Sequence, residues 1–142
     1  MTMWWERRLR EGGGVATTAD LHAMGLDDVE IRMFVGYGGL IRVRRGWYAG
    51  PTAHPRAVEA VRLGGRLACV SALHARGVPL VDDGRLHIEL PANAVLRSAA
   101  RDAFRVRVHW RRRPSRGDRG MVDVGAAWAQ ARACRISAQP IP

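Results

Sequence analysis

The chain has 142 residues, of which 47% are hydrophobic, so it can bury the core of one modest domain or of two very small ones. This composition argues against a wholly disordered protein. The formal net charge is +10, which favours an anionic partner such as nucleic acid. All 23 basic residues are arginine, so any mechanism that requires a lysine is excluded.

The first part of the chain predicts two short helices joined to a third by tight turns. Residues 4–11 are expected to form a helix that ends at a run of three glycines. Thr17 or Thr18 can cap the second helix, because a side-chain hydroxyl accepts a hydrogen bond from an N–H of the first turn. Gly25 then ends that helix.

A third helix is expected to begin at Asp27. Asp27 and Glu30 have the spacing of a capping box, with an aspartate in the first position. Ile31, Phe34 and Val35 recur at helical spacing and predict one face that is turned towards the core. Three glycines between residues 36 and 39 end the helix.

Residues 40–49 predict the two strands of a β-wing. Trp47 and Tyr48 lie on the return strand, where packing within the wing explains them better than base stacking does. Three helices followed by this strand pair indicate a winged helix-turn-helix DNA-binding domain over residues 1–50. The arginines near the tip of the wing are Arg42, Arg44 and Arg45.

The rest of the chain predicts a small helix-plus-β-hairpin domain over residues 56–134, so the fold class is α+β. The segment 51–55 contains two prolines and is expected to be a linker, and residues 135–142 a loose tail. The expected elements are helices at 57–63 and 71–76, strands around 86–90 and 104–111, and a helix at 124–134 that Asp123 caps.

Both expected strands of this second domain alternate between the two faces of a sheet. Leu86, Ile88 and Leu90 point one way, with His87 and Glu89 opposite. The second strand alternates apolar residues with basic ones in the same manner. This pattern is typical of half-buried strands.

Local spacing predicts no metal site, no cofactor and no enzymatic activity. Cys69 and Cys134 are far apart and are interpreted as two buried thiols in a reducing compartment. The histidines form no His-x-x-x-His motif, and no glycine-rich loop carries a lysine. His74 is near Cys69 and Ser71 in sequence, but core packing explains it better than a nucleophile–base pair does.

No signal peptide and no apolar run of membrane-spanning length occurs in the sequence, so a cytoplasmic protein without a membrane partner is expected.

Several of these segments resemble a known family. The wing at residues 40–49, with the preceding segments 13–21 and 25–26, resembles the winged-helix N-terminal domain of AbiEi-type antitoxins. The resemblance extends over about residues 12–134, since residues 67–78, 86–91 and 106–110 are similar to segments of actinobacterial relatives. It implies a regulator from a type IV toxin–antitoxin system that binds its own promoter through the winged helix.

The chain departs from this family in two places. It stops where many relatives continue into an endonuclease-like domain. Its third helix carries Asp27, Asp28 and Glu30 against the single basic residue Arg32, whereas relatives tend to be basic there. Phosphates repel carboxylates, so we expect these acids to cap the helix rather than to contact bases.

Each residue proposed to contact DNA has an alternative interpretation. The wing arginines can form a solvated strand face, and Arg32 can pair with Asp28 one turn earlier. A second arginine cluster at residues 97–119 can contact phosphates, bind a partner protein or serve solubility. The predicted DNA-contacting residues are Thr17, Thr18, Arg32, Arg42, Arg44, Arg45, Arg111, Arg112 and Arg113.

The sequence therefore predicts a DNA-binding transcriptional regulator, an antitoxin-type autorepressor of its own operon. Its expected partners are double-stranded DNA, a toxin protein encoded nearby and a second copy of the chain. Two alternatives remain open: a protein-interaction module that binds a toxin or other partner, and a truncated remnant of an endonuclease-bearing protein.

Overall fold

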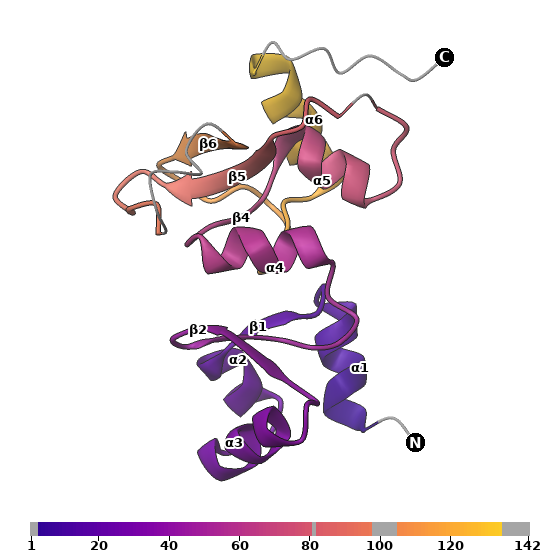
Figure 1. The fold of residues 1–142 in the computed structure, drawn as a ribbon, viewed down its shortest axis with the longest axis vertical. Coiled ribbons are helices and arrows are strands. Elements are labelled where there is room, and N and C mark those ends of the chain that lie inside the picture. Colours follow the sequence, from indigo (N-terminus) through magenta and orange to yellow (C-terminus); the bar gives the residue numbers. More distant parts are fainter. Residues whose placement is uncertain (1–2, 81, 98–104, 135–142) are drawn as a thin grey trace.

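The computed structural model describes residues 3–80, 82–97 and 105–134. Over these residues the fold is mixed α+β, with six helices and two three-stranded sheets. Figure 1 shows two halves stacked along the long axis, with α4 between them. The N-terminal half contains α1 (Trp4–Glu11), β1 (Val15–Thr17), α2 (Thr18–Ala23), α3 (Asp28–Gly36), β2 (Ile41–Arg44) and β3 (Trp47–Ala49). The C-terminal half contains α4 (Pro55–Arg62), β4 (Arg66–Leu67), α5 (Cys69–Ala75), β5 (Leu86–Pro91), β6 (Val106–Arg111) and α6 (Val124–Ala133).

The N-terminal half contains the three helices and the strand pair expected from the sequence. Its sheet has the order β1-β3-β2 and is antiparallel throughout, with Val15 and Ile41 both opposite Ala49. The strand β1 was not predicted, because three residues are too few to show a period. Helices α1 to α3 pack over a core built from Trp5, Leu9, Ala16, Leu21, Leu26, Ile31 and Leu40.

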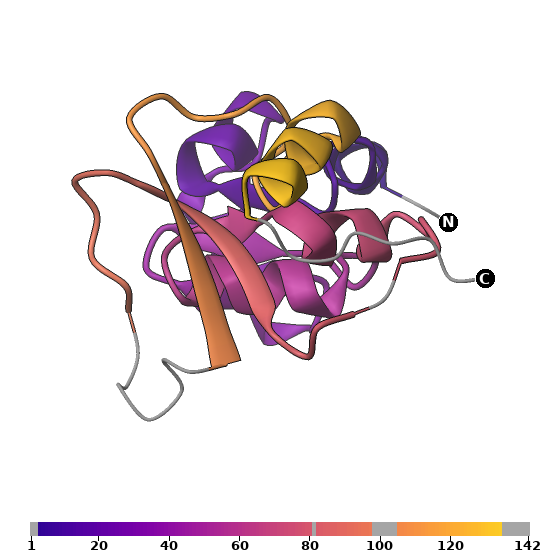
Figure 2. The ribbon, with the colours of Figure 1, turned by 90° about the horizontal axis from the view of Figure 1, so that it is seen from above.

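In the C-terminal half, helices cover both faces of the sheet. The strand order is β4-β5-β6, and Figures 1 and 2 show α4 against one face and α5 with α6 against the other. The helix α6 begins where the sequence predicts, since the side chain of Asp123 accepts a hydrogen bond from the backbone N–H of Ala126.

The predicted β-hairpin of this half is wrong. Strands β5 and β6 run parallel, with Leu86 beside Val106 and Pro91 beside Arg111. Parallel strands need a crossover connection of about a dozen residues or more, and the segment 92–105 is long enough for one. Part of this segment, including the predicted strand residue Phe104, lies outside the described residues.

The expectation that β5 is half-buried is also wrong. His87 and Glu89 are as buried as the apolar residues between which they alternate. Glu89 receives a hydrogen bond from Gln130 of α6, so the polar face of β5 is turned towards α6. A strand with a helix layer on each side has no wet face, and its polar side chains need partners inside the protein.

The two halves share apolar contacts. Val61 of α4 packs in one buried cluster with Val15, Val43 and Ala49 of the N-terminal sheet. The segment 51–55, expected to be a linker, makes a short turn and leads directly into α4. The His54 side chain caps this helix by accepting a hydrogen bond from the backbone N–H of Arg56. Because of this packing, α4 places the two halves in a defined relative orientation.

None of the helices in the described part of the chain is long and apolar enough to cross a membrane. The predicted tail, residues 135–142, lies outside the described residues.

Candidate functional site

The helix pair α2–α3 is defined by two capping boxes. The Thr17 hydroxyl accepts from the Asp20 backbone N–H at 3.1 Å, and the Asp20 carboxylate accepts from the Thr17 N–H at 2.9 Å. Asp27 and Glu30 exchange the equivalent bonds at 2.8 and 3.0 Å. The expectation that the acids of the third helix cap it is therefore confirmed for Asp27 and Glu30, but not for Asp28. Asp27 and Glu30 are held at the start of α3 by its own backbone.

The outer face of α3 is mostly apolar. Val29, Met33 and Tyr37 follow one another at intervals of four residues, and all three are exposed, Tyr37 by 82%. Arg32 is exposed on the same helix. Asp28, the alternative partner considered for Arg32, lies 2.7 Å from His22 Nε2 and pairs with that residue instead.

The hairpin β2–β3 presents two of its three arginines to solvent. Arg42 and Arg45 are exposed, on the strand β2 and in the turn that follows it. The turn is joined to the start of α2, because the backbone N–H of Thr18 donates to the carbonyl of Gly46 at 3.0 Å. Thr18 therefore lies beside the turn that carries Arg45, Thr17 pairs with Trp47 on the return strand, and Arg42 lies on the strand that leads into this turn.

Arg44 points in a different direction from its neighbours. Its Nε donates to the carbonyl oxygen of Val61 in α4 at 2.7 Å, and its guanidinium carbon lies 4.7 Å from the centre of the Trp47 ring. Burial, with a smaller contribution from Arg97, lowers the pKa of Arg44 from its ordinary value. Arg44 therefore joins the two halves of the protein.

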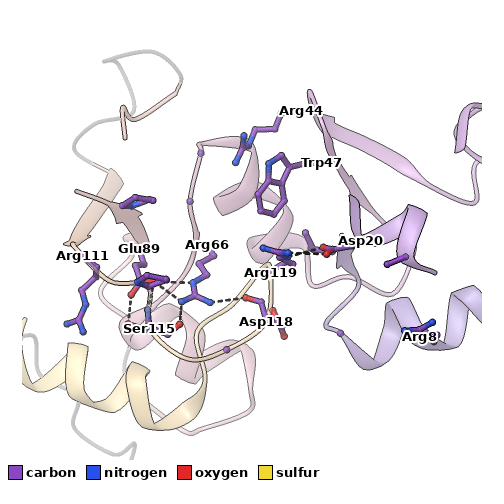
Figure 3. A pocket seen from close by; sticks show the side chains of 18 of the residues that line it. Arg8, Asp20, Arg44, Trp47, Arg66, Glu89, Arg111, Ser115, Asp118 and Arg119 are labelled. Atoms are coloured by element: carbon purple, nitrogen blue, oxygen red, sulfur yellow. Dashed lines mark hydrogen bonds and ion pairs between the residues drawn. The ribbon is translucent and has the colours of Figure 1, made fainter. Parts of the chain in front are cut away.

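A cleft of about 780 Å³ lies between the halves. Figure 3 shows residues of α1, α2 and β2–β3 on one side of it, and the loop after β6 on the other. Within the cleft Arg119 pairs with Asp20, and Arg66 pairs with Glu89. The lining includes six arginines, Arg8, Arg44, Arg66, Arg111, Arg112 and Arg119, against the acids Asp20, Glu89 and Asp118.

Of the predicted arginines at the end of β6 and just after it, Arg111 and Arg112 line this cleft and Arg113 is exposed beside them without lining it. Their loop is anchored on Glu89, a residue that sequence reasoning did not single out. This carboxylate accepts hydrogen bonds from Arg66 at 2.8 Å, Gln130 at 2.8 Å and the hydroxyl of Ser115. Burial raises its pKa, but the bonds from Ser115 and Arg66 outweigh burial, so the net pKa lies below the ordinary value.

A second group of polar side chains lies between the C-terminal sheet and the helices α5 and α6, and it includes His109, the register partner of Glu89 on β6. One ligand-type atom from each of Cys69, His87, His109 and Cys134 lies within 4.8 Å of the other three. His87 Nδ1 is 3.1 Å from His109 Nε2, and Cys134 Sγ is 3.8 Å from the same nitrogen. We call these four residues the Cys₂His₂ cluster.

Sequence reasoning missed this cluster because its members come from four elements that are distant along the chain. Cys69 begins α5, His87 is in β5, His109 is in β6 and Cys134 ends α6. Cys69 is buried as predicted, whereas Cys134 is only half-buried. His74, expected in the core, is exposed instead.

The protonation states within the Cys₂His₂ cluster are set by its surroundings. Burial, followed by the neighbouring His87, lowers the pKa of His109 to about 4, so its imidazole is neutral at pH 7. Burial raises the pKa of the Cys69 thiol to about 12.

No protein-family model matches the chain, and no curated protein matches it. Its function therefore has to be inferred from the residues themselves.

Proposed function

We propose that the N-terminal half binds double-stranded DNA as a winged helix, with α3 towards the major groove and the β2–β3 turn against the sugar-phosphate backbone. The observation that carries this proposal is the position of Arg42 and Arg45. Both are exposed, and their hairpin is tied by its turn to the first residue of α2. In this proposal Arg42 and Arg45 contact the same DNA partner as the helix pair α2–α3.

Charge elsewhere in the molecule supports an anionic partner. The chain carries a net charge of +10, and Arg111, Arg112 and Arg113 add exposed positive charge across the cleft from the wing. Each arginine that meets a phosphate releases a counterion and steepens the salt dependence of binding by about 0.9. We therefore expect the affinity for DNA to come from these arginines.

The acids of α3 are compatible with DNA binding because their carboxylates already have hydrogen-bond partners within the protein. Asp27 and Glu30 cap the helix, and Asp28 lies against His22. Among the side chains of α3, Arg32 is the cation available for a base edge, so sequence discrimination rests on few polar contacts. Weak discrimination between operator and random DNA is the expected result.

In biological terms we propose a transcriptional regulator, in line with the resemblance of the wing and its flanking segments to AbiEi-type antitoxins. Repression of its own operon is the corresponding role. A nearby toxin and a second copy of the chain are the protein partners that this role implies.

One observation favours a second function, a protein-interaction surface on α3. Val29, Met33 and Tyr37 form an exposed apolar face, which suits a protein partner better than it suits phosphates. The substitution Met33→Lys separates the two functions. If α3 faces DNA, this substitution adds a cation near the phosphates and steepens the salt dependence of DNA binding by about 0.9. If α3 binds a protein, the substitution abolishes the complex with that protein and leaves the salt dependence of DNA binding unchanged.

The test of DNA binding is a salt titration of the full chain with an upstream promoter fragment and with a random duplex of the same length. Arg42→Ala and Arg45→Ala are each expected to flatten the slope by about 0.9. Arg132→Ala is the matched control, since Arg132 is exposed on α6 in the other half and carries the same charge. Equal slopes for all three variants and the native chain would contradict the proposal.

A further inference from the structure

We propose that the Cys₂His₂ cluster is a structural zinc site, with Cys69 Sγ, His87 Nδ1, His109 Nε2 and Cys134 Sγ as its four ligands. The ligand set is the first reason. Two thiolates and two imidazoles are among the commonest donor sets of structural zinc, and tetrahedral coordination by sulfur and nitrogen is typical of this metal.

The spacing of the ligand atoms fits one ion. Zinc bonds of about 2.3 Å to sulfur and about 2.0 Å to nitrogen place tetrahedral neighbours about 3.3 to 3.8 Å apart. The two imidazole nitrogens are 3.1 Å apart, and Cys134 Sγ is 3.8 Å from His109 Nε2. All four atoms lie within 4.8 Å of one another, so small shifts of the side chains would bring them to tetrahedral spacing around one ion.

A carboxylate orients one of the ligands. His87 Nε2 donates to Asp83 Oδ2 at 2.8 Å, which places the ring proton on Nε2 and leaves the lone pair of Nδ1 directed into the cluster. Metal-bound histidines typically have such a partner on the nitrogen that does not bind the metal.

The backbone at Cys69 is strained in a way that places its sulfur in the cluster. Its φ is +54°, the one positive φ of a non-glycine residue among the described residues. The conformation is held by a hydrogen bond from the Cys69 N–H to Gln130 Oε1 at 3.0 Å. Strain of this kind tends to be kept where a side chain has a task that requires it.

The proposed ion has a structural role because the site is closed. Four protein ligands leave no position for substrate or water. The elements that supply them are packed in a chain of contacts, since β5 packs against β6 and α5, and α5 packs against α6. Bound zinc would link the start of α5, the strands β5 and β6, and the end of α6. This proposal does not rest on DNA binding.

The experiment is metal analysis of the full chain, expressed with zinc and purified under reducing conditions. One zinc per chain is expected. Replacement by Co²⁺ is expected to give the intense visible band of a tetrahedral ion, together with a thiolate-to-cobalt charge-transfer band. Less than stoichiometric zinc after reconstitution, or a cobalt spectrum without thiolate bands, would overturn the proposal. So would a Cys69–Cys134 disulfide whose reduction leaves a chain that binds no zinc.

Two variants assign the ligands. Cys134→Ser is placed at the half-buried end of α6, and His109→Ala on the edge strand β6, so both changes avoid the centre of the core. Each is expected to lower zinc affinity by more than the roughly 10- to 100-fold that loss of an outer partner costs. His74→Ala, an exposed histidine on α5, is the matched control and should bind zinc as the native chain does. Native affinity in both ligand variants would contradict the assignment.

Discussion

Arg119 and Asp20, ninety-nine residues apart in the chain, form a bidentate ion pair between the halves of the protein. The Arg119 Nε and Nη2 donate to the two carboxylate oxygens of Asp20 at 2.9 and 3.0 Å. Asp20 belongs to the capping box of α2, so the same carboxylate both starts the helix and contacts the other half. The pair spans the cleft shown in Figure 3.

The Arg119–Asp20 pair predicts a contribution to stability that depends on pH. Burial raises the pKa of Asp20, but hydrogen bonds from Arg119 and Thr17 outweigh it and bring the pKa below its ordinary 3.8. The contribution is therefore fully present above about pH 4 and is lost as the pH falls through the folded-state pKa. Arg119→Gln is expected to reduce the free energy of unfolding by about 0.5 kcal/mol at pH 7, because the Arg119 side chain is 55% exposed and solvent screens the pair.

Urea denaturation at pH 7 and near pH 2.5 measures this effect. The difference between Arg119→Gln and the native chain should shrink towards zero at the lower pH. Arg116→Gln serves as the control, since Arg116 is exposed in the same loop and its side chain makes no ion pair with any of the described residues. A difference that is the same at both values of pH would contradict the assignment to Asp20.

Glu89 is expected to be the most sensitive carboxylate of the C-terminal half. It is 4% exposed and pairs with Arg66, whose side chain is only 15% exposed. Glu89→Gln leaves the arginine as an uncompensated buried charge, at a cost of about 3 kcal/mol in the free energy of unfolding. Chemical denaturation measures this cost. Glu59→Gln on the exposed face of α4 is the matched control, and an equal effect of both substitutions would show that Arg66 finds another partner.

Arg44 is expected to affect stability and not the salt dependence of DNA binding. Its guanidinium is engaged by the Val61 carbonyl and the Trp47 ring. Arg44→Ala removes a charged hydrogen bond that joins the halves and should lower the free energy of unfolding by about 2 kcal/mol. The salt slope should stay at the native value, in contrast to Arg42→Ala. A slope reduced by about 0.9 would instead place Arg44 on a phosphate.

The zinc proposal predicts different roles for two neighbouring aspartates. Asp83 accepts the hydrogen bond from His87, whereas Asp82 pairs with Arg56 and does not touch the cluster. Asp83→Asn is expected to lower zinc affinity about 10- to 100-fold in a chelator competition. Asp82→Asn removes the same charge one residue away and should leave zinc affinity unchanged. Equal affinities of the two variants would exclude Asp83 as the partner of a metal-bound histidine.

Local signals in the sequence predicted the helices of this protein well. Thr17, Asp27 and Asp123 each stand at a helix start, and each caps the helix as expected. Capping depends on atoms three residues apart, so the sequence alone determines it. The same holds for the strand pair after α3, whose turn at Gly46 has a positive φ of 79°.

Features that depend on distant segments were not predictable in this way. The alternation in residues 86–90 indicated a strand, but it contains no information on whether the partner strand runs parallel. The burial of His87 and Glu89 follows from the position of α6 over the sheet. Predicting the Cys₂His₂ cluster would have required the relative positions of four elements, because each of its members comes from a different one.

The packing of Val61 against Val15, Val43 and Ala49 has a consequence for how the molecule loses its structure. A fragment that ends at residue 50 would expose the apolar side of its own sheet, so we expect the N-terminal half to be less stable alone than in the full chain. The two halves should therefore melt in one cooperative transition. If the C-terminal half holds the proposed zinc, a chelator is then expected to destabilise the β2–β3 hairpin as well, although none of the proposed ligands lies in that half.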